Sequence, residues 1–319
     1  MKLSIVLPVF NEEAMLENAL DRIASVLQSH DIDFEMIAVD DGSTDRTWSV
    51  IERVAATATC GEHLRGVRFS RNFGKEAAIC AGLRQASGEA VVVMDADLQH
   101  PPEVIPEMVE LWSNGGFSVV EGIKRNRQSE SMLRRLSALF FYRVLKSGTA
   151  FDLRNSTDFK LLDRGVVDTY LQFPEYGRLF RGLTAWIGLP TAAIELDIPE
   201  RAEGRSAWRV GALIDLARST IVSFTALPLH LISWIGLLGF VVSIVLALQT
   251  LWNKLFGDSA EGFPTVILLI LGMGSLILLS LGIIGEYLSE LYREVKGRPL
   301  YVVRETLGAE QSSDQSKKP

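Results

Sequence analysis

Short apolar runs alternate with helical patterns over the first two hundred residues. The apolar runs predict strands over Leu3–Val9, Phe34–Val39, Val67–Ser70 and Ala90–Met94. The spacing of apolar residues between them predicts helices over Glu12–Gln28 and Glu76–Gln85, and one that runs through Val50, Ile51 and Val54. Strands without polar alternation, separated by helices, are typical of a mostly parallel sheet covered on both faces. The sequence therefore predicts an α/β fold.

The last third of the chain has a different pattern. Leu229–Trp252 and Phe263–Ile284 contain no acidic residue, lysine or arginine, and each is long enough to cross a bilayer. Both runs are apolar on every side, which favours membrane spans over buried helices of a soluble protein. The short polar segment 253–262 separates them. We therefore predict a two-helix transmembrane hairpin.

Basic residues flank this hairpin unevenly. The polar turn holds only Lys254, whereas the flanks hold Arg209, Arg218, Arg293, Lys296, Arg298 and Arg304. The positive-inside rule then places the globular domain and both termini in the cytoplasm of a multi-pass inner (plasma) membrane protein. The expected division is a catalytic domain over 1–209, an interfacial amphipathic helix over 210–227, the hairpin over 228–288 and a cytoplasmic tail over 289–319.

A second amphipathic stretch, Met132–Lys146, carries apolar residues on one side and arginines elsewhere. It fits an interfacial helix or an ordinary helix packed on the sheet, and the pattern does not separate the two. The formal net charge of −7 argues against nucleic acid as a partner. The two cysteines, Cys60 and Cys80, are expected to be small buried thiols without a disulfide.

Polar motifs fall where the predicted strands end, which is where parallel sheets bind ligands. Asp95 and Asp97 follow the strand that ends at Met94 and point to the same face of an extended chain. Two carboxylates of this kind hold Mg²⁺ or Mn²⁺ together with substrate phosphates. This predicts a metal-assisted site for a leaving nucleoside diphosphate.

Two further motifs supply polar and cationic groups. Asp41, after the second strand, can accept hydrogen bonds from a base edge or a ribose hydroxyl, while Asp45 or Ser43 caps the next helix. The segment 71–75, which ends at Lys75, combines cations with a tight turn before a helix and suits phosphate oxygens. Arg201 lies in a similar basic loop, and solvated arginines are the plain alternative in both places.

Together these motifs resemble the family 2 glycosyltransferases with the nucleotide-sugar-binding A-type fold, and more closely the polyprenyl-phosphate glycosyltransferases. The resemblance rests on segments 8–13, 40–45, 70–76, 95–99, 285–288 and 295–301. It implies inverting transfer with Mg²⁺ or Mn²⁺. Nucleotide-binding roles are implied for Pro8, Phe10, Glu12 and Asp41; metal and diphosphate roles for Asp95, Asp97 and Gln99; and a phosphate contact for Arg201.

The hairpin resembles that of bacterial undecaprenyl-phosphate glucosyltransferases, which implies UDP-glucose rather than GDP-mannose as donor. A phosphate monoester is largely dianionic near neutral pH and needs a cationic cradle more than a general base. Candidate cations are Lys124, Arg125, Arg127, Arg134 and Arg135, with Arg134 assigned to catalysis. Asp158 either accepts a proton or positions these cations, and we favour positioning.

Two departures from the family pattern affect these expectations. Residues 155–160 read Asn-Ser-Thr-Asp-Phe-Lys, where the family usually has Asn-x-Gly-Asp-Phe-Arg. Lys160 cannot make the bidentate contacts of an arginine. Ala207 stands where the family has a basic residue, and Arg205 is the candidate substitute.

The expected reaction is transfer of a hexose from a UDP-sugar to polyprenyl phosphate for cell-envelope glycosylation. The alternatives are another donor, UDP-GlcNAc or GDP-mannose, and a catalytically silent membrane scaffold. A processive polysaccharide synthase is disfavoured because the chain lacks a Gln-x-x-Arg-Trp motif. The apolar hairpin and the family are also consistent with a homo-oligomer.

Overall fold

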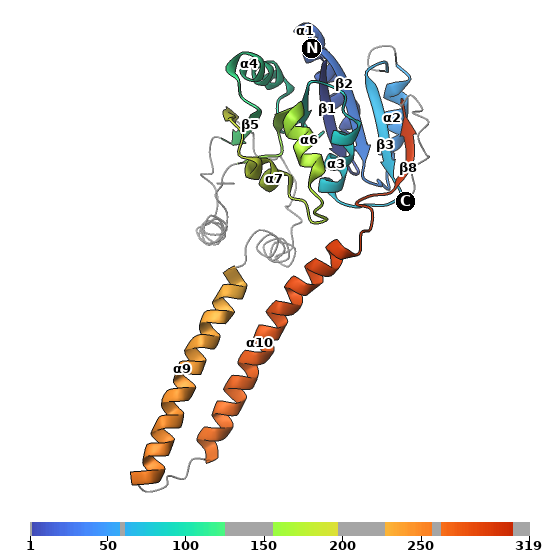
Figure 1. The fold of residues 1–319 in the computed structure, drawn as a ribbon. Coiled ribbons are helices and arrows are strands. Elements are labelled where there is room, and N and C mark those ends of the chain that lie inside the picture. Colours follow the sequence, from blue (N-terminus) through green and yellow to red (C-terminus); the bar gives the residue numbers. More distant parts are fainter. Residues whose placement is uncertain (1, 58–60, 125–155, 197–226, 257–262, 309–319) are drawn as a thin grey trace. The chain divides into compact units, whose positions relative to one another are not determined.

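The computed structural model describes residues 2–57, 61–124, 156–196, 227–256 and 263–308 (Figure 1). The chain divides into two compact units, one built around a β-sheet and the other containing two long helices. The boundary after the second long helix falls between Gly297 and Arg298. Each unit is described by itself.

The described part of the first unit contains one mixed sheet with the order β7-β5-β6-β4-β1-β2-β3-β8. The strands are β1 (Lys2–Val9), β2 (Asp33–Asp40), β3 (Leu64–Phe69), β4 (Ala90–Val93), β5 (Val119–Lys124), β6 (Lys160–Asp163), β7 (Thr191–Leu196) and β8 (Val303–Leu307). The β1–β2, β1–β4, β2–β3 and β5–β7 pairs are parallel. The pairs made by β6 and by β8 are antiparallel. This confirms the α/β class and the mostly parallel sheet.

Helices cover both faces of this sheet (Figure 1). They are α1 (Leu16–Ser29), α2 (Thr47–Ala55), α3 (Lys75–Gln85), η1 (Pro102–Val104), α4 (Ile105–Gly115), α6 (Arg164–Gln172) and α7 (Phe180–Ile187). Side chains of α1, α2 and α4 share one core with Leu3, Ile5 and Leu7 of β1. On the opposite face α3 packs so closely on β1 that a Cβ at Gly82 would lie 2.2 Å from Cγ1 of Val6.

The first helix and the third strand begin at residues other than those predicted from the sequence. The first helix begins at Leu16 rather than at Glu12, because Asn11 has a φ of 55° and the chain makes a turn before the helix starts. The third strand begins earlier, at Leu64, and ends at Phe69. Ser70 instead donates its backbone N–H to the carbonyl of Val302.

The C-terminal segment contributes to the sheet. Residues 303–307 form β8, which pairs with β3 at the sheet edge. Tyr301, just before this strand, stacks on Phe69 with ring centroids 4.8 Å apart. Part of the segment expected to be a tail is therefore integral to the first unit.

The second unit contains α9 (Leu227–Phe256) and α10 (Phe263–Val295). Within the described residues, one stretch, Gly272–Val295, is long and apolar enough to cross a membrane, and Ile232–Leu246 is a shorter apolar helix. Large apolar side chains on both helices are exposed, among them Leu278 at 71% and Trp234 at 70%. The two-span hairpin stays a prediction.

Candidate active site

A cavity of about 300 Å³ lies where β1, β2 and β4 end and α3 begins. Seven residues selected from the sequence line it: Pro8, Phe10, Glu12, Asp41, Lys75, Asp95 and Asp97. The parallel pairing of β1 with β2 and with β4 brings these segments to one edge of the sheet. The volume is at the lower end of the range for small-molecule sites.

The Asp41 carboxylate accepts hydrogen bonds from the loop that forms one wall of this cavity. Its Oδ1 accepts the backbone N–H of Phe73 at 2.7 Å, and its Oδ2 accepts that of Gly74 at 2.9 Å. Asp41 is only 3% exposed, and burial raises the pKa of its carboxyl despite these hydrogen bonds. Asp41 therefore fixes the loop that leads into α3, in addition to facing the cavity.

Gly42 lets the loop after β2 approach the loop before α3 closely. Its φ is +70°, and a Cβ would lie 2.4 Å from the backbone carbon of Arg71. Only glycine satisfies both conditions. Asp45 holds the start of α2, since its Oδ1 accepts the N–H of Thr47 at 3.0 Å. Of the two residues expected to cap this helix, Asp45 satisfies a backbone N–H at its start, although the N-cap position itself is Arg46.

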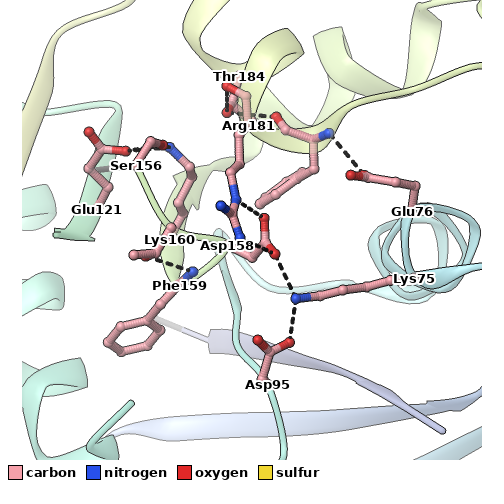
Figure 2. Close-up of polar contacts among 12 residues, drawn as sticks. Lys75, Glu76, Asp95, Glu121, Ser156, Asp158, Phe159, Lys160, Arg181 and Thr184 are labelled. Carbon is pink, nitrogen blue, oxygen red and sulfur yellow. Dashed lines mark hydrogen bonds and ion pairs between the residues drawn. The ribbon is translucent and has the colours of Figure 1, made fainter. Parts of the chain in front are cut away.

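A chain of alternating charges crosses the site (Figure 2). Lys75 Nζ lies 2.6 Å from Asp95 Oδ1 and 2.6 Å from Asp158 Oδ2. Arg181 donates to both oxygens of Asp158, from Nε at 2.6 Å and from Nη2 at 2.8 Å. One carboxylate therefore holds two cations, which come from the beginnings of α3 and α7.

The two neighbouring cations keep the Asp158 carboxyl ionised. The residue is 7% exposed, and burial alone would raise the pKa of its carboxyl. Its hydrogen bonds and ion pairs with Arg181 and Lys75 outweigh burial and hold that pKa well below the usual range. For Lys75, burial opposes the charge, but Asp158 and Asp95 raise the pKa of the amine above its ordinary value.

Asp95 and Asp97 form the candidate metal site. Both face the cavity, and Asp97 Oδ1 accepts the backbone N–H of Gln99 at 3.1 Å across a turn in which Leu98 has a φ of 55°. No group of three or more His, Cys, Asp or Glu side chains in the described ranges could hold a metal by itself. Two carboxylates that share a cavity large enough for phosphates nevertheless fit Mg²⁺ or Mn²⁺, which take the remaining oxygens from substrate and water.

Comparisons with known proteins agree with this geometry. Residues 4–171 match the glycosyl transferase family 2 model. The chain belongs to glycosyltransferase family 2. It is 38% identical over 315 residues to an uncharacterized glycosyltransferase of Synechocystis sp., covering 97% of each chain. It is 36% identical over 310 residues to the SfII prophage-derived bactoprenol glucosyl transferase of Shigella flexneri, covering 96% of this chain and 98% of that one.

A solved structure shows the same fold. Mannosyl-3-phosphoglycerate synthase from Rubrobacter xylanophilus is 16% identical, with a TM-score of 0.50, and the match covers 69% of this chain and 72% of that chain. At this identity the likeness concerns the fold alone. It agrees with the A-type α/β architecture expected for the family 2 domain.

The sequence did not indicate a role for two charged residues of this site, Arg181 and Glu76. Arg181 lies outside every motif and reaches Asp158 only through the fold. Glu76 follows Lys75 and accepts the backbone N–H of Phe180 at 2.9 Å. Burial, with the nearby charge of Asp158, raises the pKa of Glu76 to about 7. Arg181 gave no signal in the sequence because its partner Asp158 is 23 positions away. Glu76 falls within segment 70–76, on which the family resemblance rests, but that resemblance implied no role for it.

Lys160, one of the residues that depart from the family pattern, forms an ion pair with a residue of the neighbouring strand. Lys160 is 2% exposed and contacts the carboxylate of Glu121, the residue opposite it on β5, and Ser156 Oγ at 3.1 Å. Thr157 donates its hydroxyl to the carbonyl of Gly122. Figure 2 shows Glu121, Ser156 and the end of the Lys160 side chain on the side of Asp158 away from Lys75. Lys160 therefore serves a cross-strand ion pair and is not among the residues that line the cavity.

Of the expected acceptor cations, Lys124 alone lies within the described residues, and it is not among the residues that line the donor cavity. Lys124 is the last residue of β5. Arg125, Arg127, Arg134, Arg135, Arg201, Arg205 and Ala207 lie outside the described residues, as do both stretches predicted to be amphipathic helices. Their roles stay predictions.

Proposed function

We propose that the enzyme transfers glucose from UDP-glucose to undecaprenyl phosphate with inversion, giving a lipid-linked sugar for cell-envelope glycosylation. The observation that carries the proposal is the cavity in which Asp41, Asp95, Asp97 and Lys75 meet. The bactoprenol glucosyl transferases of Shigella phages SfII and SfV, which are 36% and 35% identical over nearly the whole chain, support the lipid acceptor and the glucosyl group.

The residues at the cavity suit a phosphate nucleophile. A phosphate monoester is mostly a dianion at neutral pH because its second pKa is about 6, so it reacts without losing a proton to the enzyme. Lys75 and Arg181 carry positive charge beside the carboxylates and can offset repulsion between the acceptor and the donor diphosphate. Asp158 keeps these cations in place and, with its depressed pKa, is a poor proton acceptor.

The donor would lie with its nucleotide between Pro8, Phe10, Glu12 and Asp41 and its diphosphate toward Asp95 and Asp97. A Mg²⁺ or Mn²⁺ ion held by Asp95 and Asp97, with Gln99 beside them, would neutralise charge on the departing diphosphate. Lys75 pairs with Asp95 and so keeps one carboxylate of this pair oriented before the donor binds.

We also propose that α9 and α10 form the membrane hairpin, with the catalytic unit and both termini in the cytoplasm. The support is the exposure of large apolar side chains along both helices and the excess of basic residues flanking them. Membrane-impermeant labelling of a cysteine introduced into segment 257–262 tests the topology in intact cells. No labelling in intact cells, together with labelling in inside-out vesicles, would overturn it.

A radiochemical assay tests the reaction. The full chain, reconstituted in nanodiscs, is given UDP-glucose, UDP-GlcNAc or GDP-mannose with undecaprenyl phosphate, with Mn²⁺, with Mg²⁺, or with EDTA. We expect lipid-linked glucose and UDP in equal amounts with either metal, no product with EDTA, and inverted anomeric configuration by NMR. Transfer of a different sugar would revise the donor, and no transfer with any donor would favour a silent scaffold.

The Asp97→Asn variant tests the role of the carboxylate pair in the same assay. It removes one carboxylate charge from the cavity while it keeps the shape of the side chain. We expect loss of transfer by about 100-fold or more, since a metal ligand supplies several kcal/mol of charge stabilisation.

A further inference from the structure

A second cavity of about 470 Å³ lies in the same unit, and none of its lining residues belongs to the donor cavity. Its walls come from the end of α3, the segment between α6 and α7, and residues 298–301. The lining includes three arginines, Arg84, Arg178 and Arg298, and one carboxylate, Glu175. These residues give the lining a formal charge of +2.

Arg178 is the buried arginine of this cavity, and hydrogen bonds hold it in place. It is only 9% exposed, and its guanidinium donates to the carbonyl of Glu175 at 3.0 Å, to the carbonyl of Phe173, and to Cys80 Sγ at 3.0 Å. It also lies 5.6 Å from the ring centre of Tyr170. These acceptors are neutral, so they hold the guanidinium in place without neutralising it. A buried cation of this kind favours an anion nearby.

The other two arginines are exposed and come from segments far apart in the sequence. Arg84 is in the last turn of α3, and Arg298 begins the segment that Tyr301 anchors by stacking on Phe69. Three guanidinium groups around one cavity suit a phosphate, whose oxygens accept paired N–H donors.

Exposed aromatic residues lie next to this cavity. Trp186 is 61% exposed and packs edge-on against Phe173, a lining residue, with ring centroids 5.4 Å apart. Tyr176, also a lining residue, is 37% exposed. Tryptophan and tyrosine side chains concentrate at membrane interfaces, so this surface is suited to lipid as well as to phosphate.

Residues 298–301, one wall of the cavity, follow the predicted membrane span closely in the sequence. Arg298 follows the last residue of α10, Val295, by three positions, and this step rests on the proposed membrane insertion of α10. We propose that the Arg84–Arg178–Arg298 cavity binds the phosphate group of an anionic membrane lipid, separately from the donor and acceptor of the reaction.

The test is lipid binding by the full chain in detergent, measured by native mass spectrometry with phosphatidylglycerol, phosphatidylcholine and inorganic phosphate as probes. The variant is Arg84→Gln/Arg298→Gln, which leaves the buried Arg178 intact. The matched control is Arg22→Gln/Arg53→Gln, which removes two exposed arginines of α1 and α2 and changes the net charge equally.

We expect the wild type and the control to bind phosphatidylglycerol in preference to phosphatidylcholine, and the cavity variant to bind it at least tenfold more weakly. If the wild type bound inorganic phosphate but not phosphatidylglycerol, and the cavity variant lost phosphate binding, the site would belong to a soluble phosphate. That result would overturn the proposal that the ligand is a lipid. Equal binding by the cavity variant and the control would overturn the site itself. Transfer activity, measured separately, distinguishes this result from a failure of the proposed reaction.

Discussion

Replacement of Asp158 by asparagine separates positioning from proton transfer. The change keeps the shape of the side chain but removes the charge that holds Lys75 and Arg181. Three short charge-assisted contacts, at 2.6, 2.6 and 2.8 Å, depend on that charge. In asparagine one acceptor oxygen becomes an NH₂ group, which cannot accept a hydrogen bond from the cation that it faces.

The expected loss can be worked from these contacts. Hydrogen bonds to charged groups contribute about 1.5–3 kcal/mol each when buried. The side chains of Lys75 and Arg181 are 40% and 43% exposed, which weakens their contacts with Asp158 through solvent screening. We therefore expect a combined loss of about 2–4 kcal/mol, which corresponds to roughly 30- to 1,000-fold in kcat/KM if the site must be ordered before reaction.

The pH profile is the decisive measurement. Because its pKa lies well below the usual range, Asp158 is ionised throughout an assay between pH 5 and 9, and its own titration cannot shape the profile. We expect Asp158→Asn to lower kcat/KM by a similar factor at every pH. If the wild-type profile contained a limb that vanished in the variant, or if the loss were below about threefold, the positioning role would be refuted.

Asp163→Asn is the matched control for this experiment. Asp163 ends β6, caps α6 through Gly165 and accepts from Trp112 Nε1 at 2.9 Å. The same Asp-to-Asn change there removes a charge from the same part of the chain without touching the cavity lining. We expect a small loss of thermal stability, about 1 kcal/mol, and unchanged kcat/KM.

Three further predictions concern stability. The pKa of Glu76 is raised to about 7, so folding favours its protonated form, and the stability present below pH 4.5 is lost as pH rises through 7. Glu76→Gln should remove about 2–3 kcal/mol of that decline, measured as Tm against pH. An unchanged dependence of Tm on pH would contradict the explanation that burial raises this pKa. Gly42→Ala should destabilise the unit by about 2 kcal/mol or more and raise the KM for donor, because its Cβ meets the backbone of Arg71; a Tm equal to that of wild type would show that the loop relaxes freely. Lys160→Met should lower Tm more than Lys160→Met/Glu121→Gln, because the single change leaves a partly buried carboxylate unpaired; equal losses would mean that the pair contributes no coupling.

The donor side of the site was predictable because local pattern and topology agree there. An apolar run that ends at Met94 identifies a strand, and the carboxyl ends of parallel strands share one edge of the sheet. Asp41, Asp95 and Asp97 could therefore be placed together from the sequence, and the structure confirms that they line one cavity. What the pattern missed was the second role of Asp41, which depends on the N–H groups of Phe73 and Gly74 in the turn before α3.

The remaining parts depend on contacts between distant residues. Arg181 and Asp158 are 23 positions apart, and Lys75 and Asp158 are 83 apart, so spacing carries no signal for either pair. The short strands β5 and β6 pair although a long stretch of sequence separates them, and β8 joins the sheet from far along the chain. Such nonlocal antiparallel pairings leave little trace in local periodicity.

Placing one anion between two cations suits the chemistry proposed for this site. Two free cations beside the cavity would repel each other and adopt many side-chain conformations, at a cost in side-chain entropy when the phosphate bound. Asp158 removes that repulsion and fixes both groups before substrate arrives, while its low pKa prevents it from protonating and releasing them near neutral pH. A stronger base at this position would be easier to protonate and would hold Lys75 and Arg181 less firmly. For a nucleophile that is already a dianion, a carboxylate that positions cations is therefore more useful than one that accepts a proton.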